Sequence, residues 1–189
     1  MNISYRAAET DADFGQILSL QESNLYTKTS RELQDREGFV FAEHDIGILK
    51  AMSAHVPQTV AVADGRVIGY TLAMTPEMKY QVASLIPMFE QFELCTYLGH
   101  PLSNYPFVVG GQVCVAEGYR GLGIVRGLYN ALANQVKGKY KLCVTEIAQR
   151  NPRSLKAHLK MGFKVIRTYA AQNEVWDVVA WDMTDATVL

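Results

Sequence analysis

A glycine-rich loop followed by a helical pattern is the part of this 189-residue sequence with the clearest chemical meaning. Residues 120–123 read Arg-Gly-Leu-Gly and stand between an apolar run ending at Val115 and a stretch of apolar residues at helical spacing. Glycines let the backbone approach a ligand closely, and the first N–H groups of a helix are unpaired donors with partial positive charge. The segment therefore predicts a phosphate site, where Arg120 and Arg126 can neutralise the ligand.

Two known phosphate-binding loops serve as alternatives for this segment. A Walker loop requires Gly-Lys-Ser/Thr, which is not present. A dinucleotide fingerprint requires a third glycine, and Gly127 follows Gly121 and Gly123 one position later than that pattern does. Glu146 could be the acidic partner of such a fingerprint. A nucleotide-dependent reductase therefore stays open, although its loop normally follows a strand of a parallel sheet directly.

A second polar motif lies about 30 residues further along the chain. Asn151-Pro152 predicts the start of a helix, and Gly162 predicts its end. Within it, Asn151, Ser154 and His158 share one side of the helix. These side chains could contact a ligand held by the glycine loop. Helix capping explains Asn151 equally well, and simple solvent exposure explains His158 equally well.

Charge is distributed unevenly along the chain. Residues 119–167 contain 11 Lys and Arg against the single acid Glu146, whereas residues 1–118 contain 7 basic and 14 acidic residues. A basic segment attracts the phosphates of a small ligand or of a nucleic acid. The net charge of the chain is only −1 and the basic segment has few aromatic residues, so we expect no nucleic-acid partner.

The composition, with 49% hydrophobic and 20% charged residues, is typical of a soluble globular protein, and the length predicts one domain over residues 1–189. No apolar run is long enough for a membrane span, and the N-terminus lacks a signal pattern, so we expect a cytoplasmic protein. Cys95, Cys114 and Cys143 lie in apolar runs, which favours core residues in a reducing compartment over metal ligands or disulfides.

The elements that must position these motifs follow from periodicity and turn signals. Strands are predicted at 3–8, 59–63, 67–74, 107–115, 141–147, 163–169 and 175–183. Helices are predicted at 11–25, 45–52, 122–136 and 151–161, with a further helix around Pro87 in the apolar segment 77–105. Strands alternate with helices in the second half, while hairpins at 59–74 and 163–183 require antiparallel pairing. We expect an α/β domain with a mixed, mostly antiparallel central sheet flanked by helices.

Together the two motifs resemble the GNAT N-acetyltransferase superfamily. Residues 120–125 resemble its acetyl-CoA loop, Gln/Arg-x-x-Gly-x-Gly/Ala, except that Val125 stands where Gly or Ala is usual. Residues 151–163 resemble its closing segment, Asn-x-x-Ala/Ser-x-x-x-Tyr/His-x-Lys-x-Gly-Phe. The order of the two motifs, one strand apart, makes the resemblance specific over residues 105–169. That region would form the cofactor-binding core.

The resemblance implies acetyl-CoA as co-substrate and direct transfer of its acetyl group to a primary amine of a small molecule or peptide. It implies that the strand before the loop contacts the thioester and pantetheine, that the loop holds the pyrophosphate, that Asn151 contacts the pantetheine, and that Lys160 or Arg153 approaches a phosphate. The implied cofactor-binding residues are Val113, Cys114, Val115, Arg120, Gly121, Leu122, Gly123, Ile124, Val125, Arg126, Asn151 and Lys160.

Two residues are candidates for catalysis. His158 occupies the position of a tyrosine acid in many members of the family; with an ordinary pKa of about 6.5 it would be mostly neutral at pH 7 and a weaker proton source. Glu146 ranks first as the base that deprotonates the amine, with an ion pair to a neighbouring Lys or Arg as the alternative role of this residue. A water relay, or capture of an amine that is already neutral, would need no dedicated base. The departures at Val125 and His158 also permit a non-catalytic acyl-CoA-binding sensor.

The acceptor amine is expected where segments 26–57 and 77–105 converge. The second segment is apolar and aromatic, which favours an apolar or aromatic amine, but plain core or a homodimer surface would explain it equally well. The acidic first two-thirds of the chain favour a cationic acceptor such as a polyamine or a lysine side chain. The sequence leaves this choice open.

Overall fold

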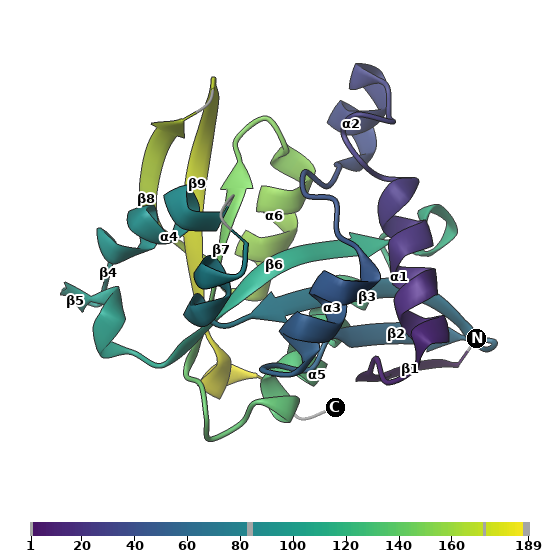
Figure 1. Ribbon diagram of the computed structural model, residues 1–189. Coiled ribbons are helices and arrows are strands. Elements are labelled where there is room, and N and C mark those ends of the chain that lie inside the picture. Colours follow the sequence, from purple (N-terminus) through teal and green to yellow (C-terminus); the bar gives the residue numbers. More distant parts are fainter. Residues whose placement is uncertain (1, 83–84, 172, 187–189) are drawn as a thin grey trace.

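The computed structural model describes residues 2–82, 85–171 and 173–186, and its ribbon is drawn in Figure 1. The strands are β1 (Ile3–Ala7), β2 (Thr59–Ala63), β3 (Arg66–Met74), β4 (Thr96–Tyr97), β5 (His100–Pro101), β6 (Phe107–Val115), β7 (Leu142–Ala148), β8 (Lys164–Ala171) and β9 (Glu174–Asp182). The helices are α1 (Asp11–Glu22), α2 (Arg31–Glu37), α3 (Ile46–Ser53), α4 (Ile86–Glu93), α5 (Ile124–Gln135) and α6 (Pro152–Met161).

Seven strands form one sheet in the order β1-β2-β3-β6-β7-β9-β8. All neighbours in it are antiparallel except β6 and β7, which are parallel. The predicted mixed, mostly antiparallel sheet is confirmed. The predicted hairpin turn at Asp64 and Gly65 is also confirmed, because both residues have the positive φ angles, 49° and 75°, of a two-residue hairpin loop.

The two parallel strands separate along their length. β6 and β7 pair only where Phe107–Val109 face Leu142–Val144. Beyond that point β6 continues through residues 110–115 beside β3, with a bulge at Gly111, while its other edge has no strand partner among the described residues. The strands diverge as a wedge in Figure 1. An unpaired strand edge presents free backbone N–H and C=O groups, so this wedge is a place where a ligand can bind.

Helices cover both faces of the sheet. Tyr70 and Leu72 of β3 belong to a core cluster with residues of α1 and α3, whereas Ala73 belongs to a cluster with residues of α5 and α6. This difference follows from the alternation of side chains along a strand. Figure 1 shows α1 and α3 in front of the sheet with α5 behind it. Packing against the sheet holds the start of α5 and the whole of α6 beside the wedge.

Two regions differ from the sequence-based expectation. The helix expected around Pro87 is short, and its Phe89 and Phe92 are buried in the core, which accounts for much of the apolar character of segment 77–105. Helix α2 was missed because its sequence has no apolar period. Its buried residue is Gln34, whose side-chain amide donates to the carbonyls of Tyr26 and Thr29.

Gly127 has a packing role rather than a place in a dinucleotide fingerprint. A Cβ atom there would lie 2.2 Å from the ring of Tyr5. We expect Gly127→Ala to lower the free energy of unfolding by about 1–3 kcal/mol, because the tyrosine must move. Gly15 in α1, whose added Cβ meets nothing within 4 Å, is the matched control, and Gly15→Ala should stabilise by about 0.5–1 kcal/mol. Urea unfolding measures the free energy of unfolding of both variants. Equal stabilisation by the two substitutions would contradict a clash between the added methyl group and Tyr5.

Candidate active site

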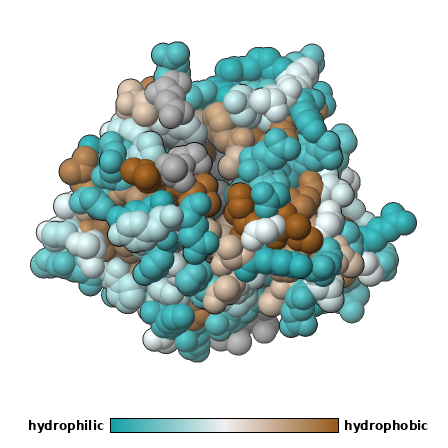
Figure 2. All heavy atoms as spheres, viewed as in Figure 1, coloured by the Kyte–Doolittle hydropathy of each residue, from teal (hydrophilic) through white to brown (hydrophobic). Residues whose placement is uncertain are grey.

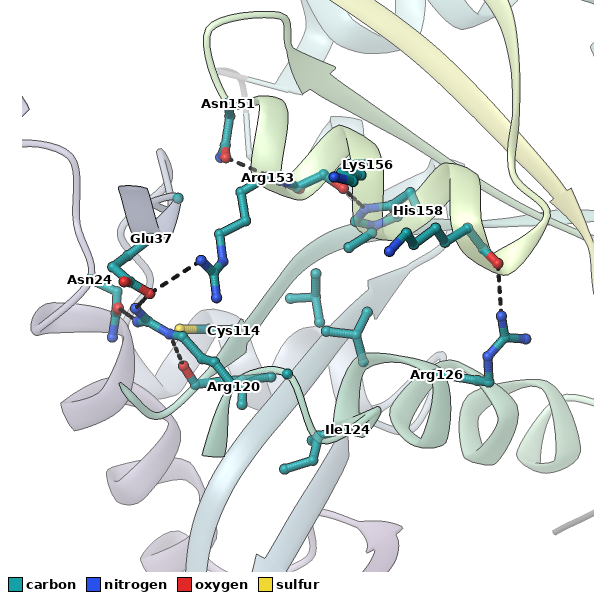
Figure 3. Close-up of a pocket in the computed structure, with 18 of the residues that line it drawn as sticks. Asn24, Glu37, Cys114, Arg120, Ile124, Arg126, Asn151, Arg153, Lys156 and His158 are labelled. Carbon is teal, nitrogen blue, oxygen red and sulfur yellow. Dashed lines mark hydrogen bonds and ion pairs between the residues drawn. The ribbon is translucent and has the colours of Figure 1, made fainter. Parts of the chain in front are cut away.

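A cavity of about 460 Å³ lies between the glycine loop, the start of α5, helix α6 and residues 37–40. Figure 3 shows its lining, with side chains of α6 facing the loop across the cavity. Residues 113–115 of β6 also line it, at the unpaired edge of that strand. The structure thus brings together nearly all of the sequence-predicted cofactor residues. The exception is Leu122, which does not line the cavity and has a side chain exposed to solvent.

The glycine loop presents backbone donors to this cavity. Gly121 and Gly123 have φ angles of 81° and 78°, and Gly123 caps α5 without any side-chain hydrogen bond. The N–H groups of residues 121–126 donate no hydrogen bond within the described part of the chain. A helix N-terminus with free N–H groups binds anions. The loop therefore fits the diphosphate that the sequence motif predicts.

Basic side chains surround the same space. The cationic residues lining the cavity are Arg120, Arg126, Arg153, Lys156 and Lys160, and Glu37 is the only carboxylate among the described residues of its lining. Sequence reasoning missed Lys156 because it stands at an unspecified position of the closing segment 151–163. Five cations against one carboxylate give the cavity a positive potential, which attracts a ligand with several phosphate groups.

Arg120 is held in a fixed position. Its guanidinium donates to the Val115 carbonyl at 3.0 Å, to Asn24 Oδ1 at 2.6 Å and to Glu37 Oε2 at 2.9 Å. Arg153 also lies 3.6 Å from Glu37. The hydrogen bond from Arg120 holds the pKa of Glu37 below its usual value. Glu37 therefore supplies the negative charge that pairs with Arg120 and Arg153 in this structure. The sequence does not predict this role, because α2 lacks a recognisable pattern.

Residues 37–44, which we call the strap, run from the first cavity toward the wedge. Asn151 Nδ2 donates to the Phe39 carbonyl at 3.0 Å, and Asn151 Oδ1 accepts from the Ser154 N–H at 3.3 Å. The predicted N-cap is thus confirmed, and the same side chain ties the strap to α6. A Cβ atom at Gly38 would lie 2.9 Å from Asn151 Oδ1, and the φ angle there is +76°. The close approach of the strap to Asn151 therefore requires glycine at this position.

A second cavity of about 170 Å³ lies in the wedge between β6 and β7. The residues lining both cavities are Phe39, Val40, Val113, Asn151, Ser154 and His158, so the two spaces meet at the open edge of β6. Glu146 of β7 lines the second cavity and not the first. The structure therefore separates a compartment with five basic residues and Glu37 from one whose described lining contains Glu146 and no lysine or arginine.

Glu146 is half-buried and has one hydrogen-bond donor. Burial raises the pKa of its carboxyl above the usual value, and a hydrogen bond from the Tyr169 hydroxyl to Oε2 offsets part of this effect. No ion pair joins Glu146 to a basic residue among the described residues. A carboxylate with a raised pKa is a better proton acceptor at neutral pH than an ordinary one.

His158 conflicts with the predicted role of a proton donor, and with the alternative of an exposed residue. It is 2% exposed and packs against Tyr129 and Phe163. Its Nδ1 lies 2.8 Å from the Ser154 carbonyl, which can only accept, so this nitrogen carries the proton. Nε2 then accepts from the Tyr129 hydroxyl at 2.9 Å. Burial lowers the pKa of His158 to about 4, so the ring is neutral at pH 7 and has no proton to give the cavity.

The buried imidazole should make stability depend on pH. The pKa of His158 is about 4 in the folded protein and about 6.5 when unfolded. Between these values only the unfolded chain binds the proton, so stability falls as the pH is lowered, by about 2–3 kcal/mol from pH 7 to pH 4.5. Urea unfolding at both pH values measures this loss. His158→Phe should lose less than the wild type, and an identical loss in the variant would contradict the assignment.

The sequence matches the family described as the acetyltransferase (GNAT) family over residues 16–163. The match covers more than half of the chain, so the chain belongs to this family. Membership makes it an acyltransferase that uses acetyl-CoA as co-substrate, and it removes the basis for the reductase and favours an enzyme over a sensor.

Solved structures share this fold. An N-acetyltransferase from Staphylococcus aureus Mu50 aligns with a TM-score of 0.63 at 19% identity, over 97% of this chain and 99% of that chain. A GNAT superfamily phosphinothricin acetyltransferase from Sinorhizobium meliloti, in complex with acetyl-CoA, aligns with a TM-score of 0.61 at 17% identity, over 96% and 89% of the two chains. No curated protein matches the sequence. Within the described residues, no helix is both long and apolar enough to span a bilayer.

Proposed function

We propose that the enzyme transfers the acetyl group of acetyl-CoA to a primary amine bound in the second cavity. The observation that carries this proposal is the meeting of the two cavities at the open edge of β6. One cavity is basic and ends at a helix N-terminus, and the other contains Glu146. A donor with phosphates at one end and a thioester at the other fits this arrangement, with the thioester at the junction.

The donor would be held mainly by the backbone. The N–H groups of residues 121–126 and the guanidinium of Arg120 would bind the diphosphate. The open edge of β6 at residues 113–115 would pair with the amide groups of the pantetheine, as an added strand pairs with a sheet edge. Lys160 and Lys156 would approach a phosphate. Asn151 would act through the strap, since both of its polar atoms are already hydrogen-bonded within the protein.

Bound acetyl-CoA supplies an activated acetyl thioester, and the chain supplies a base and a polar edge. Glu146 would accept a proton from the ammonium group of the acceptor, leaving the neutral amine that can attack the thioester carbonyl. As the C–N bond forms, the C–S bond would break, and the leaving CoA thiolate would take up the proton that the new amide nitrogen loses. Backbone N–H groups of β6 at the wedge would stabilise negative charge that develops on the carbonyl oxygen. We assign no proton donation to His158. Its bond with Tyr129 would instead fix the wall that both cavities share.

The cofactor-binding core is proposed to span residues 105–169, as the sequence suggests. The acceptor side is narrower than segments 26–57 and 77–105, because the residues of those segments that line the second cavity are Phe39, Val40, Phe41, Ala42, His44, Leu85 and Met88. Cytoplasmic location remains part of the proposal, supported by three buried free cysteines that suit a reducing compartment.

Calorimetric titration of the purified protein with acetyl-CoA tests the proposal, with NADH and NADPH as parallel controls. We expect saturable binding of acetyl-CoA and none of either dinucleotide. Release of free CoA in the presence of an amine, measured with a thiol reagent, then tests transfer. Dinucleotide binding without acetyl-CoA binding would overturn the assignment of the first cavity.

A further inference from the structure

The described residues that line the second cavity contain one ionised group. Glu146 is the only carboxylate among them, and they include no lysine or arginine. The walls are otherwise apolar or neutral, and their large apolar side chains include Phe39, Phe41, Met74, Leu85, Met88 and Trp176. Figure 2 shows hydrophobic residues over α3 and α4 on either side of a central hollow on this face of the molecule. The cavity therefore offers one negative charge inside an apolar space.

His44, one of two histidines in this lining, is held neutral by a chain of hydrogen bonds. Gln112 Nε2 donates to the Ala42 carbonyl at 2.8 Å, so Gln112 Oε1 accepts from Gln21 Nε2 at 2.8 Å. Gln21 Oε1 accepts from the His44 backbone N–H at 2.8 Å, so the nitrogen 2.8 Å from His44 Nδ1 is a donor. His44 Nδ1 must accept from it, and the ring carries its single proton on Nε2. His158 is neutral for the reason given above.

One basic side chain lies behind two aromatic residues of the lining, and it is already paired. Arg150 stacks on Phe39 at 4.3 Å and on Phe41 at 5.0 Å, and it does not line the cavity. Its guanidinium forms an ion pair with Glu174 and a hydrogen bond of 2.9 Å with Gln34. Arg150 therefore supports Phe39 and Phe41 in the cavity wall and offers no unpaired positive charge to a ligand. Three cations that form no ion pair among the described residues, Arg126, Lys156 and Lys160, line the first cavity, where the phosphates of the donor would lie.

We infer that the acceptor is a primary amine with an apolar body whose ammonium group is its only charge; this inference rests on the proposed function and narrows its substrate class. The ammonium group pairs with Glu146 before it gives up its proton. A carboxylate next to the amine would lie near Glu146 without a cation to pair with, and a buried unpaired charge is costly. A second ammonium group, as in a polyamine, would find no second carboxylate.

Steady-state CoA release at saturating acetyl-CoA tests this with amines that differ in the charge they carry beside the reacting ammonium group, and with an amide that controls for size. The probes are 2-phenylethylamine, L-phenylalanine, L-phenylalaninamide and spermidine. We expect kcat/KM for L-phenylalanine to be at least 100-fold below that for 2-phenylethylamine. The uncharged amide should recover to within tenfold, because it keeps the bulk of L-phenylalanine without its negative charge. Spermidine should be at least 100-fold poorer than 2-phenylethylamine.

The outcomes separate the inference from the proposed function. Equal or better use of L-phenylalanine or spermidine would overturn the inference and leave amine acetylation standing. An amide as poor as L-phenylalanine would also overturn it, since size would then be the cause. Binding of acetyl-CoA with no acetylation of any of the four amines would overturn the proposed acceptor chemistry, and the inference with it.

A designed cation gives an independent test in the folded protein. Met88 lines the cavity from α4 and is half-buried, so a lysine there can place its ammonium group in the cavity. Met88→Lys should reduce the preference for 2-phenylethylamine over L-phenylalanine by at least tenfold. Met88→Leu, which changes the packing without adding charge, should keep the preference. An unchanged preference in a folded Met88→Lys protein that still binds acetyl-CoA would overturn the inference.

Discussion

Gly123→Glu is expected to weaken acetyl-CoA binding by at least about 100-fold, which corresponds to about 3 kcal/mol. Gly123 caps α5 at a φ angle of 78°, next to the free N–H groups of the loop. A carboxylate there would occupy the space of the diphosphate and repel it, and it would itself be attracted to the helix N-terminus. Calorimetric titration with acetyl-CoA measures the loss directly.

Gly138→Glu is the matched control for this variant. Gly138 has a φ angle of 80°, its added Cβ meets nothing within 4 Å, and it does not line either cavity. Both substitutions add one negative charge and place a side chain at a left-handed position, which costs about 1–2 kcal/mol of stability in each. We expect normal affinity in the control. Normal affinity in folded Gly123→Glu would remove the glycine loop from the donor site.

Glu146→Gln is expected to lower kcat/KM for an accepted amine by about 10²–10⁴-fold, the range typical for loss of a general base. Glutamine keeps the size and the hydrogen bond from Tyr169 but cannot accept a proton. The affinity for acetyl-CoA should not change, because Glu146 does not line the first cavity. Turnover near the wild-type value, with an amine known to be acetylated, would contradict the role of base.

The pH dependence of the same reaction gives a second check on Glu146. A base must be deprotonated to act, so kcat/KM should rise with pH through the pKa of this carboxyl, which burial places above its usual value. The hydrogen bond from Tyr169 lowers that pKa. Tyr169→Phe should therefore move the acidic limb of the profile to higher pH, and Glu146→Gln should remove it. If the acidic limb of the kcat/KM profile stays at the same pH in both variants, it reports the titration of a group other than Glu146.

Much of the donor site could be predicted from the sequence because its signals are local. The glycine loop, the N-cap at Asn151 and the helix end at Gly162 depend on residues within one or two turns of each other, and the structure has them where the pattern predicts. The same holds for the Asp64-Gly65 hairpin. Each of these features is set by backbone conformations that few residue types can adopt.

The acceptor side could not be predicted because it depends on contacts between distant segments. The strap has no periodicity, and it is fixed by Asn151 and Gln112, which are more than 65 residues away in the sequence. His158 is buried because Tyr129 and Phe163 pack against it, with Trp181 stacked on Phe163 behind them, a packing that no helical pattern reveals. The charge of the second cavity also depends on which side chains line the wedge, and these residues are far apart in the sequence.

The burial of the three cysteines has a practical consequence for measuring this enzyme. Cys95, Cys114 and Cys143 are all buried and unpaired, and burial raises their thiol pKa values to about 11, 12 and 12. Thiol reagents react with the thiolate, which is therefore scarce at assay pH. A colorimetric thiol reagent added to the folded enzyme should therefore report released CoA with little background from the protein's own cysteines. A slow rise in colour in the absence of amine would instead report unfolding of the enzyme.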